Sequence, residues 1–307
     1  FSLGIFLQLI FNARLINNLK YNFPIIDKEM FTQTFFILFC VLILLLNLKI
    51  EGHFSNFLFV NDAGGRIAKI LFIVTCLLAL PTVLRGYIVQ NLNFFEYFII
   101  LSLAFFSSLL LLSVYDLISG YLVIEMQALA FYVLASYKRD SAFSTEAGLK
   151  YFISGSFISG IFLLGCSFIY GSVGTLNFND LSLLLSFQLD NSLANLNFFL
   201  LLGVLLVVFT LLFKISAAPF HFWSPDVYDG SPLATTVVFS IFPLIGILSI
   251  IFGTFFAIKQ KRLKRLIIFS SIVQVGFMIA ALSQYSIDGM VSLYYFLIIY
   301  ILSSVLI

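Results

Sequence analysis

The stretch that decides the fold is residues 197–232, which read NFFLLLGVLLVVFTLLFKISAAPFHFWSPDVYDGSP. An apolar run fills its first half and ends at a lysine, Lys214, and Pro219 follows shortly afterwards. The run is nearly as long as the ~20 apolar residues that cross a bilayer. Because proline removes a backbone hydrogen bond and clashes with the preceding helical turn, the stretch predicts a membrane helix that breaks just after Lys214.

The rest of the chain has the same apolar character. Of its 307 residues, 62% are hydrophobic, 10% are charged and 39 are Phe. Soluble chains carry about 25% charged residues, so a water-soluble domain is excluded. The formal net charge is +2 and the charges are scattered, which gives no indication of nucleic-acid binding.

Apolar runs separated by charged or Gly-, Asn- and Pro-containing breaks predict about ten membrane helices in a single transmembrane domain, 1–307. We expect an all-α polytopic bundle, because lipid admits only helices or closed barrels and these runs do not alternate. The chain begins at Phe1 and ends at Ile307 inside an apolar run, so we expect it to be clipped at both ends and incomplete at the C-terminal end. The runs are at about 1–16, 31–48, 67–85, 94–114, 117–136, 147–171, 193–218, 233–258, 263–283 and from 289 onward.

Two loops rich in Lys and Arg, 137–146 and 258–266, are expected on the same face of the membrane by the positive-inside rule. An even number of crossings must then separate them, but only three apolar runs lie between them. Either residues 216–232 cross or re-enter in an unusual way, or one helix is missing from the sequence.

Glu125 and Lys214 are charged residues in or at the end of apolar runs. A charge near the bilayer centre costs about 2.5–3.5 kcal/mol on insertion scales. A structural ion pair or a side chain that reaches the interface accounts for such a residue, and so does a proton or ion relay. A relay is chemically feasible because desolvation destabilises a protonated lysine, whereas a nearby carboxylate stabilises it.

Lys150, His221 and Lys264 are candidates for a secondary proton path. Histidine titrates near neutral pH, although a lone histidine among aromatic residues is more often structural. Lys150 lies about one turn into its span and can extend to the interface. Lys264 belongs to the basic cluster 259–265, which topology and contact with lipid headgroups explain more simply.

Cofactor motifs are lacking in the sequence. There is no G-x-G-x-x-G, phosphate-binding loop, H-E-x-x-H or run of cysteines, which indicates no nucleotide, flavin, haem, metal or cluster site in this chain. Cys40, Cys76 and Cys166 each lie alone in an apolar run and are expected to be packing residues. Any redox chemistry that drives this chain is therefore expected elsewhere.

Several motifs over about 115–285 resemble the antiporter-like subunits of respiratory complex I. The combination of FSTEAGLKY with PDVYDGSP is most similar to the NADH dehydrogenase subunit 2 branch of that family. The motifs are Tyr115-Asp-Leu-Ile, the segment Tyr121-Leu-Val-Ile-Glu125-Met-Gln, Phe143-Ser-Thr-Glu-Ala-Gly-Leu-Lys150-Tyr, Phe213-Lys214 followed by Pro219-Phe-His221-Phe-Trp223, Pro225-Asp-Val-Tyr-Asp-Gly-Ser-Pro232, and Lys264-Arg265-Leu.

The resemblance implies a proton-translocating membrane-arm subunit of the enzyme NADH:ubiquinone oxidoreductase. In that family the glutamate pairs with the lysine on the broken helix, which here are Glu125 and Lys214, and separation of the pair hands the proton onward. NADH, FMN, iron–sulfur clusters and ubiquinone would bind to partner subunits, and no cofactor or metal to this chain. The implied neighbours are other membrane-arm subunits and lipids, in the mitochondrial inner membrane or, as second choice, a bacterial plasma membrane.

Two departures from the family lie after Pro232. The family has a further lysine or histidine on the next helix, whereas residues 237–245 contain no titratable group. It also has two helices where residues 233–258 have room for one, so we expect about one helix to be missing near 237–243, as a gap or as a deletion. Two alternative functions stay open: a stand-alone cation/proton antiporter subunit, and a structural membrane subunit that no longer pumps.

Overall fold

A computed structural model describes residues 23–47, 52–54, 58–90, 96–181, 198–214, 216, 220 and 222–240, together with a few positions within 2–8 and 295–299. The all-α bundle is confirmed over this part of the chain, with a small β-hairpin as an addition. The helices are α2 (Phe23–Asn47), α3 (Ala63–Val89), α4 (Glu96–Leu111), α5 (Leu117–Ala135), α6 (Ala142–Val173), α8 (Phe198–Lys214), α9 (Trp223–Gly230) and α10 (Leu233–Ser240), and the strands are β1 (Gly52–Phe54) and β2 (Phe59–Asn61).

Four helices are long and apolar enough to cross a membrane, and all four coincide with predicted runs. They are the part of α2 over Glu29–Asn47, then α3, α5 and α6, while α4 and α8 are apolar but shorter. Helix α2 begins before its predicted run, because its first turns carry Asp27, Lys28 and Glu29, which end an apolar run without ending a helix. The predicted runs 263–283 and 1–16 lie wholly or largely outside the described residues.

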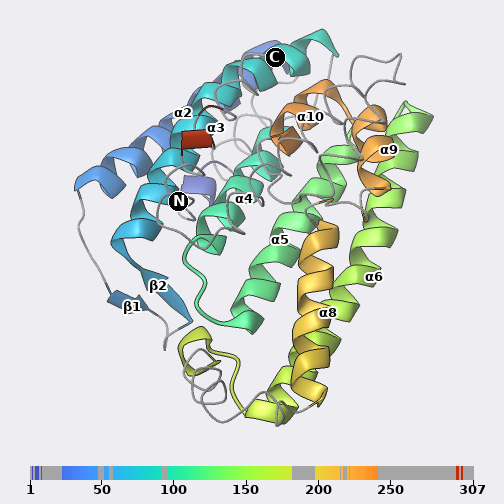
Figure 1. Ribbon diagram of the computed structural model, residues 1–307. Helices are drawn as coiled ribbons and strands as arrows, with labels where there is room; N and C mark the ends of the chain where they lie inside the picture. The colour runs from blue at the N-terminus through green and yellow to red at the C-terminus, as the bar shows by residue number, and fades with distance from the viewer. Residues whose placement is uncertain are drawn as a thin grey trace.

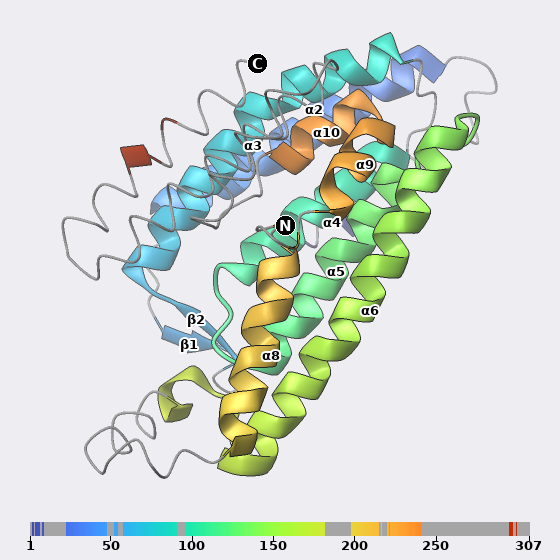
Figure 2. The same cartoon turned by 45° about the vertical axis from the view of Figure 1, so that its right-hand side comes forward.

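The helices form two groups that α4 joins (Figures 1 and 2). Helices α5, α6 and α8 lie side by side, and α2 and α3 form a second pair with α10 against α3. Aromatic rings pack where α3 meets α4: the ring centroids of Tyr87 and Phe98 are 5.2 Å apart, and those of Tyr87 and Tyr97 are 5.5 Å apart. This apolar core, reinforced by ring contacts, holds the second group, through α3, against α4.

A set of backbone hydrogen bonds fixes the start of α5. The Val60 amide donates to the Ser113 carbonyl over 2.8 Å, and the Tyr115 amide donates to the Leu58 carbonyl over 2.9 Å, so the β-hairpin holds the segment that enters α5. The Asp116 carboxylate then accepts from the Ile118 amide at 3.2 Å and caps the helix. The height of every residue along α5 is set from this end.

Candidate functional site

Glu125 and Lys214 form an ion pair between α5 and α8. Glu125 lies near the middle of α5, Lys214 is the last residue of α8, and 2.6 Å separates the lysine Nζ from the glutamate Oε1. The lysine side chain is 17% exposed and the glutamate side chain 20% exposed. Most of each charged side chain is thus withdrawn from solvent. A charge in such a position needs an opposite partner. The structure therefore brings together the two charges that stand out in the sequence.

Two glycines place α8 against α6. A Cβ atom on Gly203 would lie 2.9 Å from the Gly165 carbonyl oxygen, and a Cβ atom on Gly165 would lie 3.0 Å from the Gly203 oxygen. Neither position has room for a side chain, so the two backbones approach as closely as small-residue interfaces in membranes allow. This contact lies in α8 between Phe198 and Lys214, so it fixes the position from which the lysine extends.

The end of α8 is stabilised by a tryptophan from the next helix. The backbone leaves the helix at Ser216, which has a φ of 56°, a left-handed conformation that is uncommon for serine. The carbonyl of Phe213, in the last turn of α8, accepts from the Trp223 indole Nε1 over 3.0 Å and from the Ser216 amide over 3.0 Å. The indole also stacks on the ring of Tyr151, at 4.9 Å between centroids and 6° between planes.

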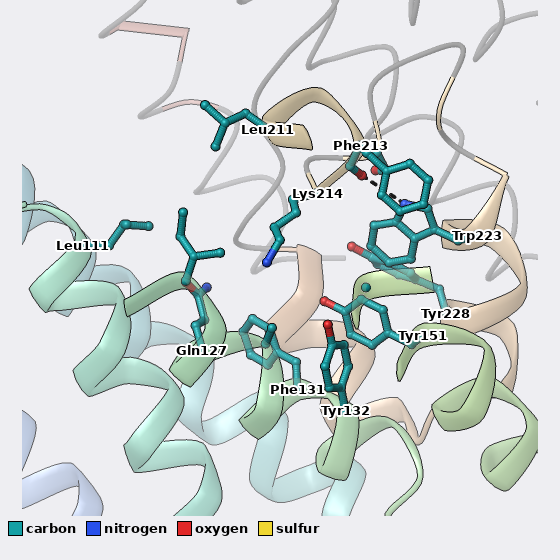
Figure 3. Close-up of a pocket in the computed structure, with 14 residues that line it drawn as sticks. Leu111, Gln127, Phe131, Tyr132, Tyr151, Leu211, Phe213, Lys214, Trp223 and Tyr228 are labelled. Carbon is teal, nitrogen blue, oxygen red and sulfur yellow. Dashed lines mark hydrogen bonds between the residues drawn. The ribbon is translucent and has the colours of Figure 1, made fainter. Parts of the chain in front are cut away.

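A cavity of about 250 Å³ opens beside the lysine. Figure 3 shows Lys214 entering it from above, with the hydroxyl groups of Tyr132 and Tyr151 directed into the same space. This volume admits several water molecules, since one water needs about 10–15 Å³ of such space and two to four polar partners. The polar residues of the wall are Gln127, Tyr132, Tyr151, Lys214, Ser216 and Tyr228.

Lys150 lies in a different place from the buried pair. Its amine is 2.8 Å from the Glu146 carboxylate, one turn away on α6, and 3.1 Å from the Asp226 carboxylate on α9. All three side chains are about half exposed, and Lys150 does not line the cavity beside Lys214. The contact joins α6 to the helix that follows the break.

His221 and Lys264, the other two candidates for a secondary path, lie outside the described residues, as do Pro219 and the loop 258–266. Their part in a proton path stays a prediction. Of the loop predicted at 137–146, the structure describes all residues, and residues 142–146 belong to α6 rather than to the loop.

Sequence reasoning did not single out Gln127, Tyr132 and Tyr151 as site residues. A signal existed for Tyr132, because it is seven residues after Glu125, two helical turns, and so lies on the same face of α5. Tyr151 carried no such signal. Its neighbour Lys150 is the charged residue of that segment, and Lys150 lies outside the cavity. Trp223 is a further site residue, because its indole donates to the Phe213 carbonyl.

Helical spans, a buried ion pair and a helix broken beside it define this chain as a polytopic membrane protein with an intramembrane charged site. It belongs to the family described as NADH:quinone oxidoreductase/Mrp antiporter, transmembrane, whose sequence profile matches residues 114–247 and 238–307. Glu125, Lys150 and Lys214 all lie in the first matched stretch. The resemblance carried by the motifs is thereby confirmed.

Two relatives show how much of the family's length is present. NADH-ubiquinone oxidoreductase chain 2 of Marchantia polymorpha is 42% identical over 242 residues, which cover 70% of this chain and 50% of the relative. NADH-quinone oxidoreductase subunit N of Rhodospirillum rubrum is 34% identical over 276 residues, which cover 81% of this chain and 56% of the relative. The chain thus spans little more than half the length of the curated relatives it matches.

Both alignments contain positions that this chain does not fill. The Marchantia alignment has 242 positions, but 70% of 307 residues is about 215, which leaves about 27 positions of the relative without a counterpart. The Rhodospirillum alignment has 276 positions, and 81% of 307 residues is about 249, which again leaves about 27. The missing positions lie inside the aligned region, not at its ends.

A solved structure shares the fold. A chain of respiratory complex I from Thermus thermophilus, solved with bound aureothin, superposes with a TM-score of 0.71 at 23% identity, over 99% of this chain and 69% of that chain. At this level of identity the likeness establishes the shared helical fold.

Proposed function

We propose that this chain is a proton-translocating membrane-arm subunit of NADH:ubiquinone oxidoreductase, in which Glu125 and Lys214 form the relay. The observation that carries the proposal is the 2.6 Å ion pair at the end of a broken helix, beside a cavity with room for water. The names of the two relatives, which are subunits of NADH-ubiquinone and NADH-quinone oxidoreductases, support the assignment to that enzyme.

The pair works as a switch with two states. While Glu125 is in contact, its negative charge stabilises the protonated amine of Lys214. When the contact opens, the amine loses its counter-ion, so its proton passes to water in the cavity and leaves a neutral lysine. When the contact between Glu125 and Lys214 closes again, the lysine amine takes up a proton from the other side of the membrane. A conformational equilibrium that biases the contact thereby couples to proton movement.

The break supplies the freedom that such a switch requires. Lys214 ends α8, and α9 is joined to that end by the Trp223 indole, which donates to the Phe213 carbonyl and stacks on Tyr151. Moving the end of α8 by a rotation at Ser216 separates the charges without unfolding a helix. The driving chemistry, with NADH, FMN, iron–sulfur clusters and ubiquinone, is assigned to partner subunits.

The partners we propose are neighbouring membrane-arm subunits and lipids, in the mitochondrial inner membrane, with a bacterial plasma membrane as second choice. Membranes extracted in mild detergent and separated on a native gel test this proposal. We expect mass spectrometry to find the chain in a very large band that oxidises NADH. A small band without NADH oxidation would contradict the proposal.

A stand-alone cation/proton antiporter subunit is the second candidate, favoured by the Mrp antiporter named in the family description. In that case the same ion pair would serve proton movement driven by a sodium or potassium gradient. Cation-driven proton flux in vesicles from the small native-gel band would assign the chain to this candidate. A third candidate, a structural subunit without pumping, would show normal proton translocation after replacement of Lys214.

We further propose that about one helix of the working protein is missing from this sequence, near 237–243. Three features support it: the odd number of crossings between the two basic loops, the two family matches that meet at residues 238–247, and the roughly 27 unfilled positions in each alignment. At 1.5 Å per residue, 27 helical residues extend about 40 Å, more than the ~30 Å of hydrocarbon.

Sequencing the transcript across codons 230–262 tests the missing helix, with peptide mapping of the assembled protein as the second measurement. We expect an additional stretch of about 27 codons that reads as an apolar helix. A peptide that runs without interruption through residues 237–247 in the assembled protein would contradict this proposal, and the ion-pair relay would be unaffected.

A further inference from the structure

Two cavities follow one another along the interface of α5 and α6, and the side chain of Tyr132 lines both. The inner cavity is the one beside Lys214. The outer cavity has a volume of about 680 Å³ and is more open. Its polar wall residues are Glu96, Ser136, Tyr137, Arg139 and Thr145.

The order of the lining residues places the outer cavity nearer the α5–α6 turn. On α5 the inner cavity is lined by residues within 124–132, and the outer cavity by 132, 133 and 136, with 137 in the turn. On α6 the inner cavity is lined by 151 and 155, and the outer cavity by 145, 148, 149 and 152. The turn carries Lys138 and Arg139, which the positive-inside rule assigns to one face of the membrane.

Tyr132 is held at the boundary by its neighbours. Its ring meets Tyr151 edge to face at 4.7 Å between centroids and meets Phe152 edge to face at 5.6 Å. Its hydroxyl lies over the bare backbone of Gly155, where a Cβ atom would overlap it. The residue is only 7% exposed and lines both cavities, so its ring lies between them.

We propose that the Tyr132 side chain is the partition that controls access of water, and with it of protons, from the outer cavity to the cavity of Lys214. The outer cavity holds a carboxylate, Glu96, and the inner cavity holds the amine of Lys214. A file of water molecules between them must pass the ring of Tyr132. The residue acts through water and through the space it fills, so it is a positioning residue.

The role of Tyr132 in pumping rests on the proposed function. Whether Tyr132 limits the access of water to the inner cavity does not. This access is measured by the reaction of a cysteine in each cavity with the permanently charged reagent 2-(trimethylammonio)ethyl methanethiosulfonate, which reaches only hydrated positions. Ala128→Cys reports on the inner cavity and Thr145→Cys on the outer cavity. Cys40, Cys76 and Cys166 are first replaced by alanine, and labelling of the whole chain in native membranes is followed by mass spectrometry.

We expect Thr145→Cys to react rapidly whatever residue occupies position 132. When position 132 is Tyr or carries Tyr132→Phe, which both keep the ring, we expect the reagent to label Ala128→Cys slowly. With Tyr132→Ala it is expected to react at least about tenfold faster, the factor that corresponds to about 1.4 kcal/mol of barrier. Tyr132→Leu, which preserves more packing, provides the second variant and is expected to give a smaller acceleration.

The matched control is Tyr121→Ala, on the same helix. Tyr121 stacks on Phe162 at 5.8 Å and lines neither cavity. If the reagent labelled Ala128→Cys at the same rate whether position 132 is Tyr or Ala, the proposal would be overturned. It would also be overturned if Tyr121→Ala accelerated this labelling as much as Tyr132→Ala does, because a general loosening of the helix packing would then explain both. Failure of the proposed function is read separately, from the native-gel band that contains the chain.

Discussion

Lys214 and Lys150 both contact carboxylates, but in different surroundings. Lys214 and Glu125 are 17% and 20% exposed, whereas Lys150, Glu146 and Asp226 are 48%, 59% and 48% exposed. An exposed pair gains little, since water and salt screen it, whereas a buried charge that loses its partner is strongly destabilised. The first contact is therefore suited to a switch and the second to a clamp between helices.

The largest effect is expected from Lys214→Met. It removes the group that carries the proton in the proposed relay and leaves Glu125 without its counter-ion, so we expect proton translocation to be lost. A charged Glu125 left without a partner in this part-buried position would also lower the stability of the complex. Proton uptake per NADH oxidised, in sealed vesicles, measures the first effect, and thermal melting of the assembled complex measures the second.

Lys150→Met is the matched control for that measurement, because it removes the same charge from a position that does not line the cavity. The comparison of the two lysines would be wrong if both variants lowered the ratio of protons to electrons equally. The double variant Glu125→Gln/Lys214→Met is expected to recover stability relative to Lys214→Met, without recovering proton translocation.

A large structural effect is expected from Gly203→Val. The added atoms would meet the Gly165 carbonyl and Ile169, forcing α8 away from α6 and moving Lys214 with it. Overpacking of this kind costs about 1–3 kcal/mol. The melting temperature of the assembled complex and the proton-to-electron ratio are both expected to fall.

Gly160→Val provides the control, since a Cβ atom at Gly160 of α6 has nothing within 4 Å. If Gly160→Val destabilised the complex as much as Gly203→Val, helix propensity rather than the close contact of α6 and α8 would account for the loss.

A smaller effect is expected from Trp223→Phe. The ring that stacks on Tyr151 is largely preserved, but the Phe213 carbonyl loses the indole donor and, among the described residues, keeps the Ser216 amide. Loss of one such hydrogen bond costs about 0.5–1.5 kcal/mol. Thermal melting and proton translocation at rising temperature measure it, and a variant as stable as the parent would show that the indole does not hold the break.

The smallest effect is expected from breaking the exposed contact through Asp226→Asn. Contacts between exposed charges contribute little, and salt weakens them. We therefore expect a slight fall in melting temperature that disappears at high ionic strength. A loss that persisted in high salt, or a change in the ratio of protons to electrons, would show that Lys150 acts as more than a clamp.

Most of the helices could be predicted from hydropathy, because a membrane helix must bring its own apolar surface and satisfy its own backbone. Predicted helix boundaries were wrong where a helix extends into charged residues. Helix α2, for example, begins in the charged segment before its apolar run. The hairpin of β1 and β2 had no sequence signal, since three-residue strands lie within the length of an ordinary loop. Its backbone bonds to the entry of α5 could be found only in three dimensions.

The amino-acid sequence alone was enough to predict a membrane protein and a helix that ends after Lys214. It also indicated that Glu125 and Lys214 are charges that are costly to place in a bilayer. These conclusions rest on transfer free energies and on the chemistry of proline, which act locally. The folded structure was needed to show that the two charges are partners, that the Trp223 indole donates to the Phe213 carbonyl and that Tyr132 lines two cavities. Those facts depend on which helix faces which, and two glycines 38 positions apart, Gly165 and Gly203, set that facing through a contact between backbones.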